Sequence, residues 1–369
     1  MNQLEKKISE LIYSNGAISF ESFMEMALYE PALGYYTSKD TNIGRDGDYF
    51  TSPHLHPIFG AMIGRQLEEF FSIMGEPEDF SILEFGAGRG YLAKDILDYL
   101  RDKKIYKFLR YLISEINPFL AEKQKALIKD HKDRVSWVDI SKINPFIGCV
   151  ISNELLDAFP VHLIEVRGQV KEVYVSIKDG RFIETLRDAS PPIYEYLKEF
   201  SIELPEGYRT EVNLRIKKWL KEIDRILKKG FILTIDYGYT AKDYYSEERS
   251  RGTLLCYKGH EISEDPYTDI GKKDITSHVN FSSLKKWADA LGIETIGFCP
   301  QGTYLVSLGI DEAIMRLYDS PDYLFDVAKI KRLILPGTLG ETHKVMLQCK
   351  GYERPQLRGF SLRNQLKYL

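Results

Sequence analysis

The sequence predicts an α/β fold with a doubly wound sheet of seven strands, because short apolar segments alternate with helical segments along most of the chain. The clearest repeat runs from a strand at 81–85 to a helix at 91–100, and from a strand at 111–115 to a helix at 118–129. Strands that alternate with helices form parallel sheets with right-handed crossovers. The remaining strands are expected at 135–138, 149–152, 231–236, 294–298 and 344–349.

Three segments interrupt this alternation. Residues 29–57 are rich in Gly, Pro, Asp, Thr and aromatic residues, which predicts a long but ordered loop, and 237–279 predicts a second irregular stretch. Residues 161–211 begin with alternating apolar and polar positions, which indicates a hairpin-type insertion. We therefore divide the chain into an N-terminal helical segment with its loop (1–75), a first core part (76–160), the insertion (161–211) and a second core part with a substrate loop at 237–279 (212–369).

Composition and charge argue against several kinds of partner. The 369-residue chain has a net charge of -4 and an isoelectric point near 6.1, which gives no electrostatic argument for nucleic acid or an anionic membrane. No run of about 18 apolar residues is present, so we expect no membrane insertion. The N-terminal residues also lack the apolar stretch of a signal peptide. The sequence gives no indication of oligomeric state.

The cysteines and histidines predict neither disulfides nor a metal site. The four cysteines are far apart and form no Cys-x-x-Cys pair, which argues against a disulfide framework and a zinc site. His54 and His56 could lie on one face of a strand, but no third ligand clusters with them. We expect a reducing, cytoplasmic compartment and no bound metal.

The loop "EFGAGRG" between the first strand and helix of the core indicates a nucleoside site. Glycines permit close backbone approach, and the following helix offers unpaired N–H groups, although a plain glycine-containing turn is the simpler reading. The spacing is Gly86-x-Gly88-x-Gly90, with Tyr91 where dinucleotide sites carry their third glycine. Glu84 would repel a diphosphate but accept hydrogen bonds from an ammonium group. The loop therefore favours a cationic, phosphate-free nucleoside over NAD.

Two further carboxylates follow neighbouring strands. Glu115 ends the strand "YLISE", where a carboxylate can bind both ribose hydroxyls, as in nucleotide-binding folds generally. This position alone does not separate NAD from S-adenosylmethionine. Asp139 follows the third strand and could accept from an adenine amino group, although a solvated loop carboxylate explains it equally well.

The E/D-x-G-x-G-x-G loop with its acidic strand end resembles the signature of class I S-adenosylmethionine-dependent methyltransferases, which have a Rossmann-like sheet. More narrowly, the chain resembles the MidA family, which includes mitochondrial complex I assembly-factor methyltransferases implicated in symmetric dimethylation of an arginine on a complex I subunit. The resemblance covers residues 20–345 and rests on six blocks in the same order: "YYTSKDTNIGRDGDYFTSPHLHPIFG", "ILEFGAGRGYLAKDIL", "VISNELLDAFPVH", "LTIDYG", "RGTLLCYKGH" and "DPYTDIGKKDITSHVNF".

The resemblance implies S-adenosyl-L-methionine as cofactor and assigns residues to it. Gly86, Gly88 and Gly90 would hold its methionine part, with Glu84 near the amino group and Glu115 at the ribose. The N-terminal segment would close over the cofactor through three further residues: Asp48, Thr51 and Ser52. It also implies a protein substrate of the respiratory complex I-subunit type, modified on an arginine.

The segment "ISNELLDAFP" follows the fourth strand, where ligands of doubly wound folds bind. Asn153, Glu154 and Asp157 are therefore expected beside the transferable methyl group. Glu154 is the first candidate and Asp157 the second for a bidentate clamp on a guanidinium. As an alternative, Asn153 and Asp157 cap a following helix.

Two more positions carry open alternatives. His278 could orient Glu154 or take a proton, or it could be an ordinary residue at a helix start. Asp236, at the end of "FILTID", could bind substrate or satisfy local amides. The leading hypothesis is a protein methyltransferase acting on arginine. The alternative is an assembly factor or chaperone that binds the cofactor and catalyses little, and an NAD-dependent oxidoreductase is disfavoured by the loop.

Overall fold

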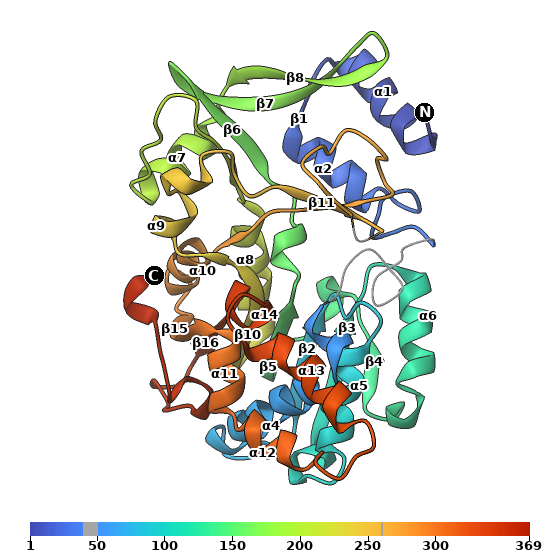
Figure 1. The fold of residues 1–369 in the computed structure, drawn as a ribbon, viewed down its shortest axis with the longest axis vertical. Helices are drawn as coiled ribbons and strands as arrows, with labels where there is room; N and C mark the ends of the chain where they lie inside the picture. Colours follow the sequence, from blue (N-terminus) through green and yellow to red (C-terminus); the bar gives the residue numbers. More distant parts are fainter. Residues whose placement is uncertain (40–50, 260) are drawn as a thin grey trace. The chain divides into compact units, whose positions relative to one another are not determined.

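The computed structural model describes residues 1–39, 51–259 and 261–369, which belong to two compact units (Figure 1). Unit 1 comprises Met1–Tyr49, Leu156–Lys218 and Tyr239–Leu284, and unit 2 comprises Phe50–Leu155, Trp219–Gly238 and Lys285–Leu369. The division differs from the four parts expected from the sequence, because the N-terminal helices, the insertion and the loop 239–284 share one unit. Long-range pairing of β1 with β7 joins the N-terminal segment to the insertion, and local sequence patterns do not reveal such pairing.

Unit 2 is built around the central sheet, whose strand order is β15-β16-β10-β5-β2-β3-β4 along one path. The neighbours from β4 to β10 pair in parallel, whereas β16 pairs antiparallel with both β10 and β15. The strands of the path are β2 (Phe80–Phe85), β3 (Leu109–Ser114), β4 (Val135–Trp137), β5 (Phe146–Asn153), β10 (Leu227–Tyr239), β15 (Glu294–Pro300) and β16 (His343–Lys350).

The predicted alternation of strands and helices is present, with two corrections. The sheet contains eight strands, of which seven form the path, and it is mixed rather than wholly parallel. The sequence pattern marks strands but not their direction, so the antiparallel β16 could not be recognised. Every residue of β2 is buried, as expected for an inner parallel strand covered on both faces.

The helices of unit 2 provide the apolar cover for this sheet (Figure 1). Phe70 of α4 stacks on Phe231 of β10 with ring centroids 4.2 Å apart, so the helix is fixed against the middle of the sheet. The helices are α3 (Ser52–Leu55), α4 (Ile58–Ile73), α5 (Tyr91–Leu100), α6 (Pro118–Leu127), α11 (Gln301–Ser307), α12 (Ile310–Met315), α13 (Tyr323–Ile334) and α14 (Leu339–Thr342). Helices α8 (Arg215–Ile226) and α10 (Phe281–Asp289) contain residues of both units.

Unit 1 contains a five-stranded antiparallel sheet in the order β1-β7-β6-β9, with β8 paired to β7. Helices α1 and α2 supply the apolar residues of its core together with β6 and β7. The elements are α1 (Gln3–Asn15), β1 (Ile18–Ser19), α2 (Phe20–Tyr29), β6 (His162–Arg167), β7 (Gln169–Lys178), β8 (Arg181–Asp188), α7 (Pro191–Glu199) and β9 (Arg209–Val212). The expected hairpin-type insertion is thus a larger sheet that also recruits the N-terminal segment.

The stretch 237–279, expected to be irregular, contains a three-stranded sheet in the order β12-β11-β13. Its elements are α9 (Ala241–Tyr244), β11 (Leu255–Lys258), β12 (Glu261–Ser263) and β13 (Asp274–Thr276), followed by β14 (Val279–Asn280). Strands of two to four residues are too short to show an alternating pattern, which explains why they were missed. Across the described ranges, the helices are too short or too polar to span a bilayer.

Candidate functional site

The glycine loop leaves the carboxyl end of β2 in a conformation that favours glycine. Gly86, Gly88 and Gly90 have φ angles of 61°, 54° and 86°, all in the left-handed region. A Cβ on Gly86 would lie 3.1 Å from Leu155, whereas a Cβ on Gly88 would meet no described atom within 4 Å. Gly88 therefore faces open space, and its backbone can be approached closely by a ligand.

Glu84 lies just before this loop and its carboxylate is almost fully buried. The side chain accepts a hydrogen bond of 2.7 Å from the Tyr111 hydroxyl, and the residue is 2% exposed. Burial raises the pKa of Glu84 to about 7; the Tyr111 hydrogen bond opposes this rise and the charge of Glu115 adds to it. The described residues place no lysine or arginine in an ion pair with Glu84. A cationic group supplied by a ligand would satisfy this carboxylate.

Glu115, directly after β3, is fixed in place by its neighbours. Its carboxylate accepts from the Asn117 backbone N–H at 2.9 Å and from the Gln124 amide at 2.8 Å. Gln124 also donates to the Gly88 carbonyl at 2.8 Å and accepts from the Trp137 indole at 2.7 Å. Burial raises the pKa of Glu115. Gln124 thus links the ribose candidate to the glycine loop, a connection that the sequence did not show.

Asp139 has a local structural role. Its carboxylate accepts from the Ser141 backbone N–H at 3.0 Å and hydroxyl at 2.7 Å, and it lies 3.2 Å from the Lys142 ammonium. The Ser141 hydrogen bonds lower the pKa of Asp139, and its side chain is half exposed. These contacts match the loop-carboxylate alternative. Adenine binding by Asp139 stays a prediction.

Glu154 follows the last residue of β5 and adopts an unusual backbone conformation. Its φ is 50°, a left-handed value uncommon outside glycine, and its N–H donates to the Ile235 carbonyl at 2.8 Å. Oε1 accepts from the Ser52 N–H and the Asn153 amide, both at 3.2 Å. The side chain is only 8% exposed. Backbone strain of this kind at the edge of a sheet is concentrated at functional sites.

Two histidines that the sequence analysis did not place here lie near Glu154. The His343 imidazole Nε2 lies 3.6 Å from Oε2 of Glu154, and His54 senses the charge of the same carboxylate. Burial lowers the pKa of His54, and its Nδ1 bonds the Thr51 hydroxyl. His343 is the first residue of β16, and its antiparallel pairing with Tyr237 brings it to the carboxyl edge of the sheet. In the sequence, the one indication of this position was that His343 directly precedes the last predicted strand, 344–349.

The N-terminal residues expected to cover the cofactor are partly described. Ser52 donates from its backbone to Glu154, as given above, and its hydroxyl donates to Gln301 at 3.0 Å. Thr51 precedes helix α3 and is buried. Asp48 lies outside the described residues, so its expected role is untested. Thr51 and Ser52 thus belong to the same unit as the glycine loop.

Asp236 lies near the end of β10, and its carboxylate accepts hydrogen bonds from nearby backbone N–H groups. Its carboxylate accepts from the Leu155 N–H at 3.2 Å and the Tyr237 N–H at 2.9 Å, and it is fully buried. These contacts correspond to the second of the two alternatives considered for this residue. By holding Leu155, Asp236 supports the turn that begins at Glu154.

Asp157 and His278, the other two catalytic candidates, belong to unit 1. Asp157 is 5% exposed, and its carbonyl accepts from the Ser277 N–H at 2.9 Å. The His278 N–H donates to the Thr253 hydroxyl at 3.0 Å, and its ring lies against Tyr239. Neither residue belongs to the compact unit that contains Glu154, and their catalytic roles stay predictions.

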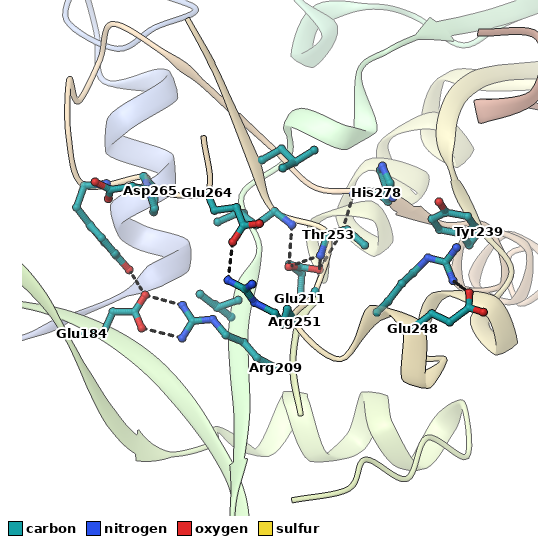
Figure 2. A pocket seen from close by; sticks show the side chains of 17 residues that line it. Glu184, Arg209, Glu211, Tyr239, Glu248, Arg251, Thr253, Glu264, Asp265 and His278 are labelled. Atoms are coloured by element: carbon teal, nitrogen blue, oxygen red, sulfur yellow. Dashed lines mark hydrogen bonds and ion pairs between the residues drawn. The ribbon is translucent and has the colours of Figure 1, made fainter. Parts of the chain in front are cut away.

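Unit 1 also contains a cavity of about 760 Å³ between β8, β9 and the segments 248–255 and 264–267, with His278 in its wall (Figure 2). Glu211, 1% exposed, accepts from the Thr253 and Leu254 N–H groups and from the Thr253 and Tyr244 hydroxyls at 2.9–3.1 Å. Arg209 forms a two-pronged ion pair with Glu184. The charged groups of this wall are therefore largely committed to one another.

The sequence predicts that the protein holds no bound metal. Among residues 1–39, 51–259 and 261–369, no group of three or more His, Cys, Asp or Glu side chains is arranged to hold a metal ion. His56 instead accepts from the Ile58 N–H through Nδ1 and has Nε2 3.7 Å from Asp326.

Comparison with known proteins gives a consistent set of relatives. A model of a family of S-adenosyl-L-methionine-dependent methyltransferases matches residues 62–299. The mitochondrial protein arginine methyltransferase NDUFAF7 of Mus musculus is 28% identical over 86% of this chain and 77% of its own length. Its Drosophila melanogaster homologue is 27% identical over 82% of this chain and 74% of its own length.

Two solved structures match nearly the whole chain. A Burkholderia thailandensis protein crystallised with S-adenosyl-homocysteine is 29% identical, with a TM-score of 0.89 over 99% of this chain and 96% of that one. A native crystal structure from the same organism is 30% identical, with the same TM-score and coverage.

Proposed function

The chain belongs to a family of S-adenosyl-L-methionine-dependent methyltransferases, and from this premise we propose that it methylates an arginine side chain of a protein. The curated relatives are named protein arginine methyltransferases. The cofactor is S-adenosyl-L-methionine, which supplies a methyl group made electrophilic by its sulfonium. The proposed acceptor protein is a respiratory complex I-type subunit.

The residues of unit 2 fit this cofactor chemically. The open face of Gly88 accommodates a closely approaching ligand, and the Glu84 carboxylate, which has a hydrogen bond from Tyr111 but no ion pair among the described residues, suits an ammonium group. Glu115, held by Asn117 and Gln124, presents a fixed carboxylate for ribose hydroxyls. We propose that these residues bind and orient the cofactor, because alignment supplies much of the acceleration in an in-line transfer.

The observation that carries the arginine proposal is the incomplete hydrogen bonding of the Glu154 carboxylate. Its Oε1 has two long hydrogen bonds, and its Oε2 has only the imidazole 3.6 Å away among the described residues. A nearly buried carboxylate with unused acceptor capacity suits the planar fork of a guanidinium. We propose that Glu154 binds the target arginine and holds its positive charge.

The compartment proposed for the protein is a reducing one, such as the cytoplasm. All four cysteines are free and buried, as is typical of proteins that remain in a reducing environment. Burial raises the pKa of Cys149, Cys256, Cys299 and Cys349, which keeps these thiols unreactive.

Substitution Glu154→Gln tests the arginine clamp. We expect kcat for protein methylation to fall by about 100-fold or more, while the affinity for S-adenosyl-homocysteine stays near wild type, because the amide retains the shape but loses the charge. Tritiated S-adenosyl-L-methionine and host extract give the activity, and calorimetric titration gives the affinity. The labelled residue is identified by amino-acid analysis.

The matched control is Glu172→Gln in unit 1, where Glu172 is buried and paired with His162 at 2.7 Å. This variant should keep wild-type methylation. Unchanged activity in Glu154→Gln would remove Glu154 from the site. A wild-type protein that binds S-adenosyl-homocysteine but labels no protein would favour the alternative of an assembly factor with little catalysis.

A further inference from the structure

The His343 imidazole directs Nε2 toward the Glu154 carboxylate. The Thr342 hydroxyl lies 3.2 Å from the Thr338 carbonyl and 3.1 Å from Nδ1 of His343, and it has one hydrogen for these two contacts. We assign that hydrogen to the carbonyl, so that Nδ1 carries the ring hydrogen and donates to the hydroxyl. Nε2 is left with its lone pair toward Oε2 of Glu154.

Two acceptors thus face each other at the carboxyl edge of the sheet. Nε2 of His343 and Oε2 of Glu154 are 3.6 Å apart, and Nε2 makes no hydrogen bond within the described residues. Their side chains are 5% and 8% exposed, so water gives them little compensation. A proton placed between these two atoms would form a hydrogen bond from one to the other and would stabilise the pair.

Arginine methylation releases one proton. The guanidinium enters with one positive charge and leaves, as methylguanidinium, with one positive charge, while the methyl donor loses its own positive charge. The new N–C bond forms as the S–C bond breaks, and one N–H proton must leave the substituted nitrogen. The reaction therefore needs an acceptor close to the carboxylate that holds the guanidinium.

We propose that His343 is a positioning residue that acts through Glu154 and takes up this proton at Nε2. This inference rests on the proposed arginine methylation. Glu154 receives the proton from the guanidinium, and the imidazole behind it accepts the proton, so Glu154 returns to its charged form. The sequence analysis considered such a role for His278 as one of two alternatives, and here we propose it for His343.

Other groups near the pair come from neighbouring elements. Tyr237 of β10 packs its ring on His343 with the ring centroids 5.5 Å apart, and Lys344, next in β16, is held by the Glu341 carbonyl of α14. On the side of Glu154, the charges of this carboxylate and of Arg89 both act on the imidazole of His54 in α3.

Substitution His343→Gln separates proton uptake from simple support. The glutamine amide keeps a polar group of similar size beside Glu154, but it cannot accept a proton. We expect KM for the acceptor protein within about 2-fold of wild type and kcat reduced about 10-fold or more. The probes are tritiated S-adenosyl-L-methionine and the labelled protein purified from host extract.

The control is His162→Gln, which changes the corresponding imidazole of the Glu172–His162 pair in unit 1 and should leave kcat unchanged. Wild-type kcat in His343→Gln would overturn the proposal. A wild type that methylates no arginine would overturn the proposed function, and the inference with it.

A second measurement does not depend on turnover. In ¹³C-labelled protein without cofactor, the His343 ring signals are identified by their loss in His343→Gln. We expect these signals, but not those of His162, to shift when Glu154 is replaced by Gln. Unshifted signals would show that the two side chains are not coupled and would overturn the proposal even if methylation is intact.

Discussion

The carboxylates Glu154 in unit 2 and Glu211 in unit 1 are both nearly buried, yet their surroundings differ. Glu211 accepts four backbone or hydroxyl donors of its own unit at 2.9–3.1 Å. Glu154 has two hydrogen bonds at 3.2 Å and an imidazole at 3.6 Å. Glu154 also has a strained φ of 50°.

This difference is the reason why we propose a structural role for Glu211 and a functional one for Glu154. Glu211 fixes the segment 251–254, and Gly252 is required there because a Cβ would lie 2.2 Å from the Glu211 carboxylate and its φ is 81°. Its acceptor capacity is used within the unit. The acceptor capacity of Glu154 is not fully used by the described residues, and its backbone adopts a left-handed conformation that is uncommon outside glycine.

The largest expected effect contrasts two glycines of the two units. Gly88 and Gly180 have φ angles of 54° and 73°, and a Cβ on either would meet nothing described within 4 Å. Valine at either position should cost about 1–3 kcal/mol of unfolding free energy through backbone strain. Only Gly88→Val should also weaken binding of S-adenosyl-homocysteine, by about 100-fold or more, which is about 2.8 kcal/mol.

Calorimetric titration and thermal unfolding of both variants measure these two effects separately. If Gly88→Val binds S-adenosyl-homocysteine as tightly as Gly180→Val, the glycine loop does not contact the ligand, and the comparison between the two regions loses its basis.

The core of unit 2 could be predicted from the sequence because its information is local. Strand β2 and helix α5 were expected within one residue of their observed bounds, and the loop between them favoured a cationic, phosphate-free nucleoside. The same local information made Glu84, Glu115 and Glu154 candidates, and their roles stay predictions. Glu84 is the penultimate residue of β2, whereas Glu115 and Glu154 directly follow β3 and β5, and in a parallel sheet the carboxyl ends of the strands meet.

The partners of these residues could not be predicted. His343 reaches Glu154 because β16 runs antiparallel, and its position depends on pairing over more than a hundred residues. Gln124 reaches Glu115 and Gly88 from the buried face of α6. A single glutamine in a helical pattern does not indicate which residues it will contact. In unit 1, β1 pairs with β7, although the whole first core part lies between these two strands in the sequence.

A smaller effect is expected from Glu211→Gln. The amide offers one acceptor where the carboxylate offered two, and its NH₂ group faces backbone donors, so at least one buried donor loses its partner. We expect a loss of about 1–3 kcal/mol in unfolding free energy, with binding of S-adenosyl-homocysteine unchanged. Urea unfolding and calorimetric titration measure the two quantities. A stable Glu211→Gln protein with weakened ligand binding would reverse the roles given to the two carboxylates.

The smallest effect concerns the charge of Glu84. Burial raises the pKa of this carboxyl from 4.5 to about 7, so in the free protein it is mostly protonated at pH 6. Its stabilising contribution is present below pH 4.5 and is lost as the pH rises through about 7. A ligand ammonium beside Glu84 favours the ionised form, and binding at pH 6 should therefore release up to about one proton.

Titration of S-adenosyl-homocysteine in buffers with different heats of ionisation measures this release. Affinity should rise between pH 5 and 7, by at most about tenfold per pH unit, since one group is coupled to binding. In Glu84→Gln both the proton release and the pH dependence should disappear, because the amide does not titrate. Equal proton release from wild type and Glu84→Gln would place the ligand ammonium elsewhere. A release confined to wild type would show that unit 2 has a second carboxylate whose capacity, like that of Glu154, is reserved for a ligand.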